Sequence, residues 1–173
     1  MLAFTTHETF DQLEAIKTSV VSLSFYEYYD ELQIEYTLSD GTSYTRSAEE
    51  ECFLADDSCR SKLGQWLADH LPEMTNLVKF SYTSRFFSEM SYDFLVSKPE
   101  SLKQVTICHC DNLDMKFLIG IESLTLENVL LEEENDGSLA MLQGLPSSIK
   151  HVVVGALGDI RLPLFHFTLE SYD

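Results

Sequence analysis

Apolar residues recur in the second half of the chain with one repeated spacing, in which three apolar positions are separated first by two residues and then by one. Four copies occur, at Leu77, Phe80 and Tyr82; at Leu102, Val105 and Ile107; at Ile121, Leu124 and Leu126; and at Ile149, Val152 and Val154. Val20, Leu23 and Phe25 form a candidate fifth copy. A motif that recurs every few tens of residues is typical of strands stacked in a solenoid. The pattern therefore predicts parallel strands over about 77–154.

Four segments show the periodicity of amphipathic helices. Two precede the four copies, at residues 6–19 and about 59–71, and two shorter ones lie between copies, around 86–94 and 139–145. Their apolar positions are Phe10, Leu13 and Ile16; Leu63, Trp66, Leu67 and Leu71; Phe86, Phe87, Met90 and Phe94; and Leu139, Met141, Leu142 and Leu145. Helices between parallel strands predict the α/β fold class, as a short solenoid with helices on its convex side.

A β-hairpin is expected over residues 31–46, where apolar and polar side chains alternate. Asp40-Gly41 is a strong signal for a two-residue turn. With these two residues as the loop, Glu35 would lie opposite Arg46 on the neighbouring strand. The expected architecture is therefore an N-terminal helix and hairpin joined to the solenoid.

The chain has 173 residues and a formal net charge of −18. This length suits one hydrophobic core, so we expect a single domain over 1–173, with an acidic part at 1–76 and the repeated part at 77–173. Residues 1–57 carry thirteen acids against Lys17 and Arg46, a net of −11, which leaves −7 for the rest. Such acidity repels nucleic acid and favours a basic protein partner.

The sequence also predicts where the protein resides. No apolar run approaches the roughly 20 residues of a membrane helix, so no membrane partner is expected. The first residues lack the basic start and apolar stretch of a signal peptide. We therefore expect a cytoplasmic protein whose cysteines, Cys52, Cys59, Cys108 and Cys110, are reduced thiols.

The second copy carries a more specific pattern. Leu102, Val105 and Ile107 are followed by Cys108-His109-Cys110 and then by Asp111-Asn112-Leu113. This segment resembles the leucine-rich-repeat family in its irregular, cysteine-containing variety, and the resemblance covers about residues 77–157. It implies a protein-binding solenoid in which Cys110 is a buried ladder residue. The other copies depart from the family pattern, with Arg85, Val129 and Leu157 at the ladder position.

In a repeat strand, the residues between the apolar positions face the concave surface. These are Lys79, Ser81 and Thr83; Gln104, Thr106 and Cys108; Ser123, Thr125 and Glu127; and His151, Val153 and Gly155. Five are candidate partner contacts, namely Lys79, Gln104, Thr106, Glu127 and His151. Outer faces of strands are commonly polar, so an ordinary solvated face is the alternative interpretation.

A second candidate contact surface is the stretch that interleaves tyrosines with acids, namely Tyr26, Glu27, Tyr28, Tyr29, Asp30 and Glu31. Tyrosines are favoured as interface anchors, and the acids could steer a basic partner. The alternative is that most of these residues belong to a strand or the core. The acidic segments Glu49–Asp57 and Glu132–Asp136 are expected to be solvated loops.

Metal binding and catalysis find less support in the sequence. Cys108-His109-Cys110 has one residue between its cysteines, whereas structural zinc sites usually have two to four, so we expect neither metal nor cofactor. His109 and His151 fall on or near successive predicted strands and could lie beside Glu127 in an arrangement suited to acid–base chemistry. No nucleophile or phosphate-binding motif accompanies them, so we expect that the protein is not an enzyme.

These observations lead to one preferred hypothesis with alternatives. The preferred function is an acidic protein-binding module that acts stoichiometrically, as an inhibitor or immunity-type protein that neutralises a basic partner. The main alternative is a leucine-rich-repeat adaptor or a secreted bacterial effector that recognises a host protein. An enzyme that uses His109 or His151, and a mimic of DNA, are weaker alternatives.

Overall fold

The computed structural model describes residues 6–28, 31–49, 57–84, 91–108, 114–129, 144–156 and 165–168. Its strands are β1 (Val20–Tyr28), β2 (Glu31–Leu38), β3 (Ser43–Glu49), β4 (Lys79–Ser84), β5 (Gln104–Cys108), β6 (Ser123–Val129), β7 (His151–Ala156) and β8 (Phe165–Thr168). Its helices are α1 (Thr6–Ile16) and α2 (Asp57–His70), with short 3₁₀ helices η1 (Lys17–Ser19), η2 (Leu71–Glu73), η3 (Asp93–Ser97) and η4 (Met115–Leu118).

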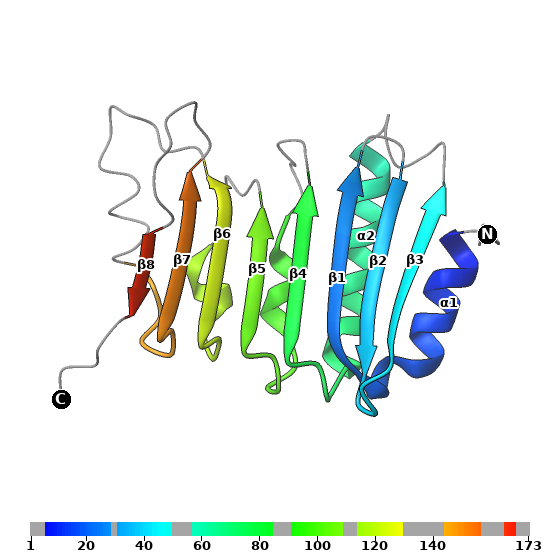
Figure 1. Ribbon diagram of the computed structural model, residues 1–173, viewed down its shortest axis with the longest axis horizontal. Helices are drawn as coiled ribbons and strands as arrows, with labels where there is room; N and C mark the ends of the chain where they lie inside the picture. Colours follow the sequence, from blue (N-terminus) through cyan, green and yellow to red (C-terminus); the bar gives the residue numbers. More distant parts are fainter. Residues whose placement is uncertain are drawn as a thin grey trace.

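The described strands form one mixed sheet in the order β3-β2-β1-β4-β5-β6-β7-β8 (Figure 1). Neighbours from β1 through β4, β5 and β6 to β7 pair in parallel. β2 and β3 extend the sheet antiparallel beyond β1, and β8 pairs antiparallel with β7. Because β3 and β8 stand at opposite ends of this order, the sheet is open and is not a closed barrel. The predicted α/β class is therefore confirmed.

The repeated apolar spacing predicts these parallel strands, and the structure shows that the copies also align across the sheet. Its second positions pair across the sheet, as do its third positions. The two aligned sets are Leu23, Phe80, Val105, Leu124 and Val152, and Phe25, Tyr82, Ile107, Leu126 and Val154. All are buried except the half-buried Val154. The candidate fifth copy, in β1, thus joins the same ladders as the other four.

The backbone also repeats where each parallel strand begins. Val78 N donates to Val21 O at 2.9 Å, and Lys103 N donates to Val78 O at 2.9 Å. Glu122 N then donates to Lys103 O at 2.9 Å, and Lys150 N to Glu122 O at 2.8 Å. Each strand therefore starts on the preceding one with the same hydrogen bond.

The described helices cover one face of the sheet. Figure 1 shows α2 and the short helices behind the strands, and α1 beyond β3. Phe94 of η3 packs against Phe80 of β4, with ring centroids 5.5 Å apart. Phe10 of α1 packs on Trp66 of α2 at 4.8 Å. None of the helices in the described ranges is long and apolar enough to span a membrane.

The two longer helix predictions are confirmed, because α1 with η1 covers 6–19 and α2 covers most of 59–71. Of the shorter predictions, the one around 139–145 falls largely outside the described residues. The one around 86–94 does too, although Phe94 lies in η3. Cys110, Arg85 and Leu157 of the predicted ladder also lie outside them, and no side-chain position is described for Val129.

The hairpin prediction is correct in place and wrong in register. Glu35 pairs with Thr45, and Arg46 pairs with Ile34, so Glu35 and Arg46 are not opposite one another. The cause is a three-residue loop: Gly41 N donates to Leu38 O at 2.9 Å, and Leu38 N to Thr42 O at 2.8 Å. Gly41 adopts a φ of 86°, as the third residue of such loops requires.

Candidate functional site

The sheet face opposite the helices, here called the open face, is lined by small polar side chains. Its residues alternate along each strand with the buried apolar positions. Three rows cross the parallel strands: Lys79, Gln104, Ser123 and His151; Ser24, Ser81, Thr106, Thr125 and Val153; and Tyr26, Thr83, Cys108 and Glu127. No described helix lies on this face.

The first of these rows, here called the entry row, consists of the first residues of β4, β5, β6 and β7. Lys79, Gln104 and His151 are exposed, and Ser123 is half-buried. The structure thus aligns three of the predicted contact residues in one row. Adjacent strands lie about 4.8 Å apart, so the row extends roughly 14 Å from Lys79 to His151.

The other two predicted contacts in the repeated part lie farther along the strands. Thr106 is half-buried in the second row, and Glu127 is exposed in the third. The predicted proximity of His151 to Glu127 is wrong, because His151 pairs with Ser123, four residues before Glu127. That separation corresponds to about 13 Å along the strand. His109, the other histidine of the enzyme hypothesis, lies outside the described residues.

Glu127 instead contacts a cysteine that the sequence did not single out as its partner. Cys108 Sγ lies 3.2 Å from Glu127 Oε2 and 3.5 Å from Thr83 Oγ1. Burial raises the pKa of the Cys108 thiol to about 12, and the hydrogen bond and charge of Glu127 act in the same direction. The thiol therefore stays protonated at neutral pH and donates its hydrogen to the carboxylate.

The tyrosine-rich stretch is divided between the two faces. Tyr26 is half-buried on the open face, where it pairs with Thr83. Glu27 is a correction: it follows Phe25 onto the helix side, is buried, and accepts a 2.7 Å hydrogen bond from the Tyr82 hydroxyl. A carboxylate held there cannot steer a partner at the surface. Tyr29 and Asp30 lie outside the described residues, and for Tyr28 and Glu31 only the strand pairing is described.

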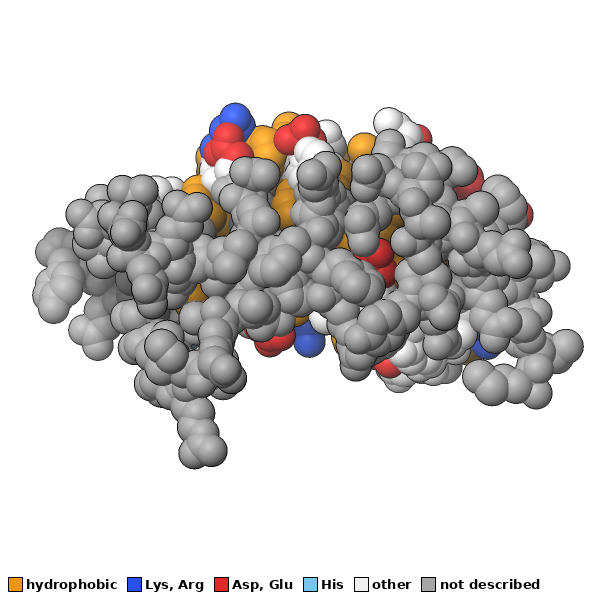
Figure 2. All heavy atoms as spheres, turned by 90° about the horizontal axis from the view of Figure 1, so that it is seen from above, with side chains coloured by type: hydrophobic (Ala, Val, Ile, Leu, Met, Phe, Trp, Pro, Cys, Tyr) orange, Lys and Arg blue, Asp and Glu red, His pale blue; other side chains and the backbone are white. Residues whose placement is uncertain are grey.

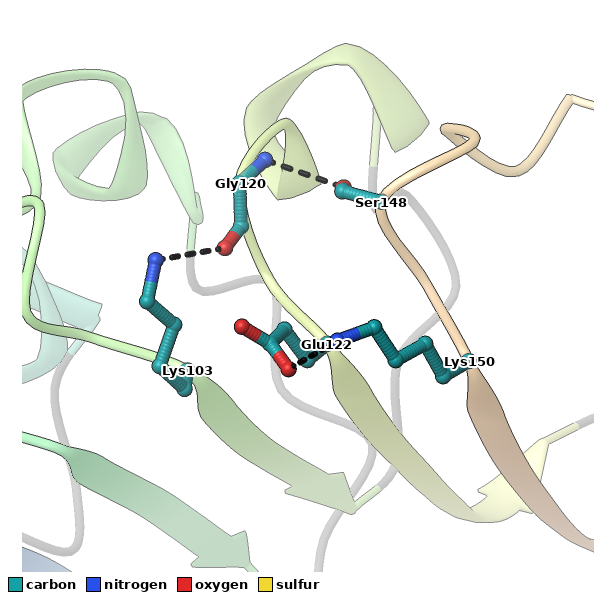
Figure 3. Close-up of polar contacts among 5 residues, drawn as sticks. All are labelled: Lys103, Gly120, Glu122, Ser148 and Lys150. Atoms are coloured by element: carbon teal, nitrogen blue, oxygen red, sulfur yellow. Dashed lines mark hydrogen bonds and ion pairs between the residues drawn. The ribbon is translucent and has the colours of Figure 1, made fainter.

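A polar cluster stands just before the entry row (Figure 3). Lys150 Nζ donates to Glu122 Oε2 at 2.7 Å, and Lys103 Nζ donates to the Gly120 carbonyl oxygen at 3.3 Å. Gly120 N in turn donates to Ser148 Oγ at 3.0 Å. The hydrogen bond and charge of Lys150, with the charge of Lys103, hold the pKa of the Glu122 carboxyl below its usual value.

Charged and apolar groups are distributed unevenly around the described part of the molecule. Seen from above, hydrophobic side chains gather mostly toward the helix side, and charged ones stand at both margins (Figure 2). Val96 and Ile119, from the helix layer, are 62% and 65% exposed. The acidic segment 132–136 and all of 49–57 except its two ends lie outside the described residues, so the loop predictions made for them stay predictions.

Metal coordination and family membership gain no support. Within the described ranges, no three His, Cys, Asp or Glu side chains gather closely enough to hold a metal ion. Cys52, His109 and Cys110 lie outside those ranges, and no side-chain position is described for Cys59. No family model matches this chain, and no curated protein and no solved structure matches it.

Proposed function

We propose that this protein is a stoichiometric protein-binding module whose open face meets its partner. The observation that carries the proposal is a largely parallel sheet with described helices on one face and mainly polar side chains on the other. Lys79, Gln104, Glu127 and His151 are the exposed ones. Parallel sheets are usually covered by helices on both faces, so an open polar face is unusual. A binding role accounts for it, because a partner could cover the face on which no described helix lies.

The finer architecture that we propose is a short solenoid similar to leucine-rich repeats. Four strand starts that repeat one backbone hydrogen bond, and two apolar ladders in register, support it. In solenoids each repeat contacts mainly its neighbours, and the stacked strands present an extended binding surface. β2 and β3 would then be a hairpin appended to the first repeat.

For the partner, our first candidate is a basic protein that this chain inhibits, as an immunity-type protein does. The net charge of −18 supports it, because summed negative charge accelerates the encounter with a basic protein. The second candidate is an adaptor or effector that recognises its target through side chains of the repeats. The alignment of Lys79, Gln104 and His151 in one exposed row favours this second candidate.

The test begins with a partner captured from the source cells and purified. Association is then measured from low to about physiological salt, where the Debye length is about 8 Å. The inhibitor hypothesis predicts that the association rate falls by about tenfold or more. An association rate that does not change with salt concentration would exclude electrostatic capture. Failure to bind any protein at 1:1 stoichiometry would contradict the proposed function itself.

Two sets of substitutions separate the two candidates. One set replaces Lys79, Gln104, Thr106 and His151 by alanine, and the other replaces the acids of 49–57 and 132–136 by their amides. Loss of binding only in the first set identifies recognition through the repeats. Slower association only in the second set identifies electrostatic capture by the acids.

A further inference from the structure

The residues that begin the parallel strands carry a surplus of positive charge. The position before each strand and its first residue are Val78 and Lys79, Lys103 and Gln104, Glu122 and Ser123, and Lys150 and His151. They include three lysines and a histidine against one acid. Because β4 to β7 run parallel, all these residues lie at the same edge of the sheet. These starting positions therefore carry a net positive charge in a protein whose net charge is −18.

The one acid among these eight positions, Glu122, is already neutralised. Glu122 forms an ion pair with Lys150, and Figure 3 shows its carboxylate between the Lys150 and Lys103 side chains. Lys103 donates to the uncharged carbonyl of Gly120, so that contact leaves its charge uncompensated. Glu122 therefore offsets one lysine, and the charges of Lys79 and Lys103 remain.

Lys79 is distinct among the lysines with described side chains. Lys17, Lys116 and Lys150 form ion pairs, and Lys98 and Lys103 donate to carbonyl oxygens. No described residue accepts a hydrogen bond from the Lys79 ammonium or pairs with it, and its side chain is exposed on the open face. Its charge is therefore available to a partner.

We infer that the entry row binds an acidic segment of a protein partner, with a carboxylate placed on Lys79. Lysine, glutamine, serine and histidine can all donate hydrogen bonds to carboxylate oxygens. Glu127, the acid farther up β6, lies about 13 Å from the row, beyond the Debye length of about 8 Å at physiological salt. An extended segment of six residues spans about 20 Å, enough to cross the roughly 14 Å row.

This inference rests on the proposed function, and it adds a preferred orientation of the bound partner. A partner that carries an acidic segment in an otherwise basic surface would be oriented by the contrast between this edge and the rest of the chain. The same segment on a neutral partner would serve the adaptor hypothesis equally well.

The test uses a defined probe and the whole chain. Amide chemical shifts of the ¹⁵N-labelled protein are followed by NMR during titration with an acetylated, amidated hexaglutamate peptide, at about physiological salt. Hexaglutamine is the neutral control peptide. We expect hexaglutamate alone to shift the amides of Lys79, Gln104, Ser123 and His151. Lys79→Glu should weaken this binding at least about tenfold, since it places like charges together.

Lys116→Glu is the matched control variant. It makes the same charge change at an exposed lysine of η4, in the helix layer, and should leave the binding within about twofold. Absent shifts, shifts away from the row, equal effects of the two variants, or equal shifts with inorganic phosphate would each overturn the inference. The peptide titration does not depend on finding a partner. A negative titration would leave the proposed binding through the acids untouched, and failure to find a 1:1 partner would leave a positive titration valid.

Discussion

At the scale of single residues, two acids that look alike in the sequence have opposite surroundings. Glu27 is buried beneath the sheet with the Tyr82 hydroxyl, whereas Glu127 is exposed on the open face beside Cys108. A buried carboxylate requires hydrogen bonds, because an unpaired one loses its hydration without compensation. The buried position of Glu27 therefore depends on the hydrogen bond from Tyr82 as well as on the strand alternation.

The first prediction concerns Cys108 and alkaline pH. Its folded pKa of about 12 lies above the ordinary value of 9.0, so the folded protein holds this proton where the unfolded chain loses it. The stability that this thiol contributes is present below pH 9.0 and is lost progressively as pH rises toward about 12. The slope is at most about 1.4 kcal/mol per pH unit.

Urea unfolding from pH 8 to 10.5 provides the measurement. Cys108→Ala removes the thiol and should lack this slope. The variant is less stable than the wild type at pH 8, and this difference in unfolding free energy should shrink as pH rises. Other groups that titrate in this range are shared by both proteins and cancel in the difference. Parallel pH curves for the two proteins would show that the folded state does not hold the thiol proton.

Both residue contacts leave a trace in the sequence. Glu27 lies two positions after Phe25, so strand alternation places it on the buried side; the acidic and aromatic composition of the stretch nevertheless favoured an exposed surface. Copies two and three begin at Leu102 and Ile121, and the same offset of 19 residues connects Cys108 with Glu127. The register that aligns the apolar ladders thus also aligns the polar residues between them.

At the scale of elements, the apolar spacing was sufficient for the strands, and the hairpin shows where such patterns fail. Alternation located β2 and β3. A loop that is one residue longer than expected shifts the pairing by one residue, so Glu35 lies opposite Thr45. Asp40-Gly41 is compatible with a two-residue and with a three-residue loop, since both favour glycine at a positive φ. Attraction between Glu35 and Arg46 is too weak to decide the register, because exposed pairs contribute about 0–1 kcal/mol.

The second prediction compares two glycines that differ in backbone conformation. Gly41 has a φ of 86°, whereas Gly64 lies within α2 and an added Cβ there meets no atom within 4 Å. Gly41→Ala should destabilise the protein by about 1–2 kcal/mol, because a Cβ is disfavoured in the left-handed region. Gly64→Ala should stabilise it by about 0.5–1 kcal/mol through higher helix propensity.

Chemical denaturation of the two variants measures both changes against the same wild type. The Gly64 variant controls for the added methyl group, since both substitutions enter open space. An equal response of the two variants would contradict the assigned backbone conformation of the hairpin loop.

At the scale of the whole molecule, the sequence gives the net charge directly but does not show where the charges lie on the surface. The composition gives −18, but only the strand register shows that lysines gather where the parallel strands begin. The positions of Lys79, Lys103 and Lys150 near the strand starts became clear once the neighbouring apolar positions were aligned. The polar cluster in Figure 3 could not be predicted from the sequence, because it depends on the Gly120 backbone and on Ser148.

The third prediction follows from repulsion among the surplus acids. A compact chain with a charge of −18 is destabilised by its own field, and salt screens that field. The thermal midpoint should therefore rise as the salt concentration increases from about 10 mM to about 150 mM. Sodium, potassium and tetramethylammonium chloride should act alike, because screening depends on ionic strength. A midpoint that falls, or that rises with only one cation, would contradict this explanation.

The hydrogen bond shared by the strand starts also has a consequence for the order of folding. The strands β5, β6 and β7 each pair with a strand whose apolar copy begins 19 to 28 residues earlier in the chain, because the copies begin at 77, 102, 121 and 149. β4 instead pairs with β1, from which it is separated in the sequence by the β2–β3 hairpin and α2. Closing that longer loop costs more chain entropy, and non-local pairings slow folding. The union of β1 with β4 is therefore the step that should set the folding rate, after which the remaining strands can add in sequence.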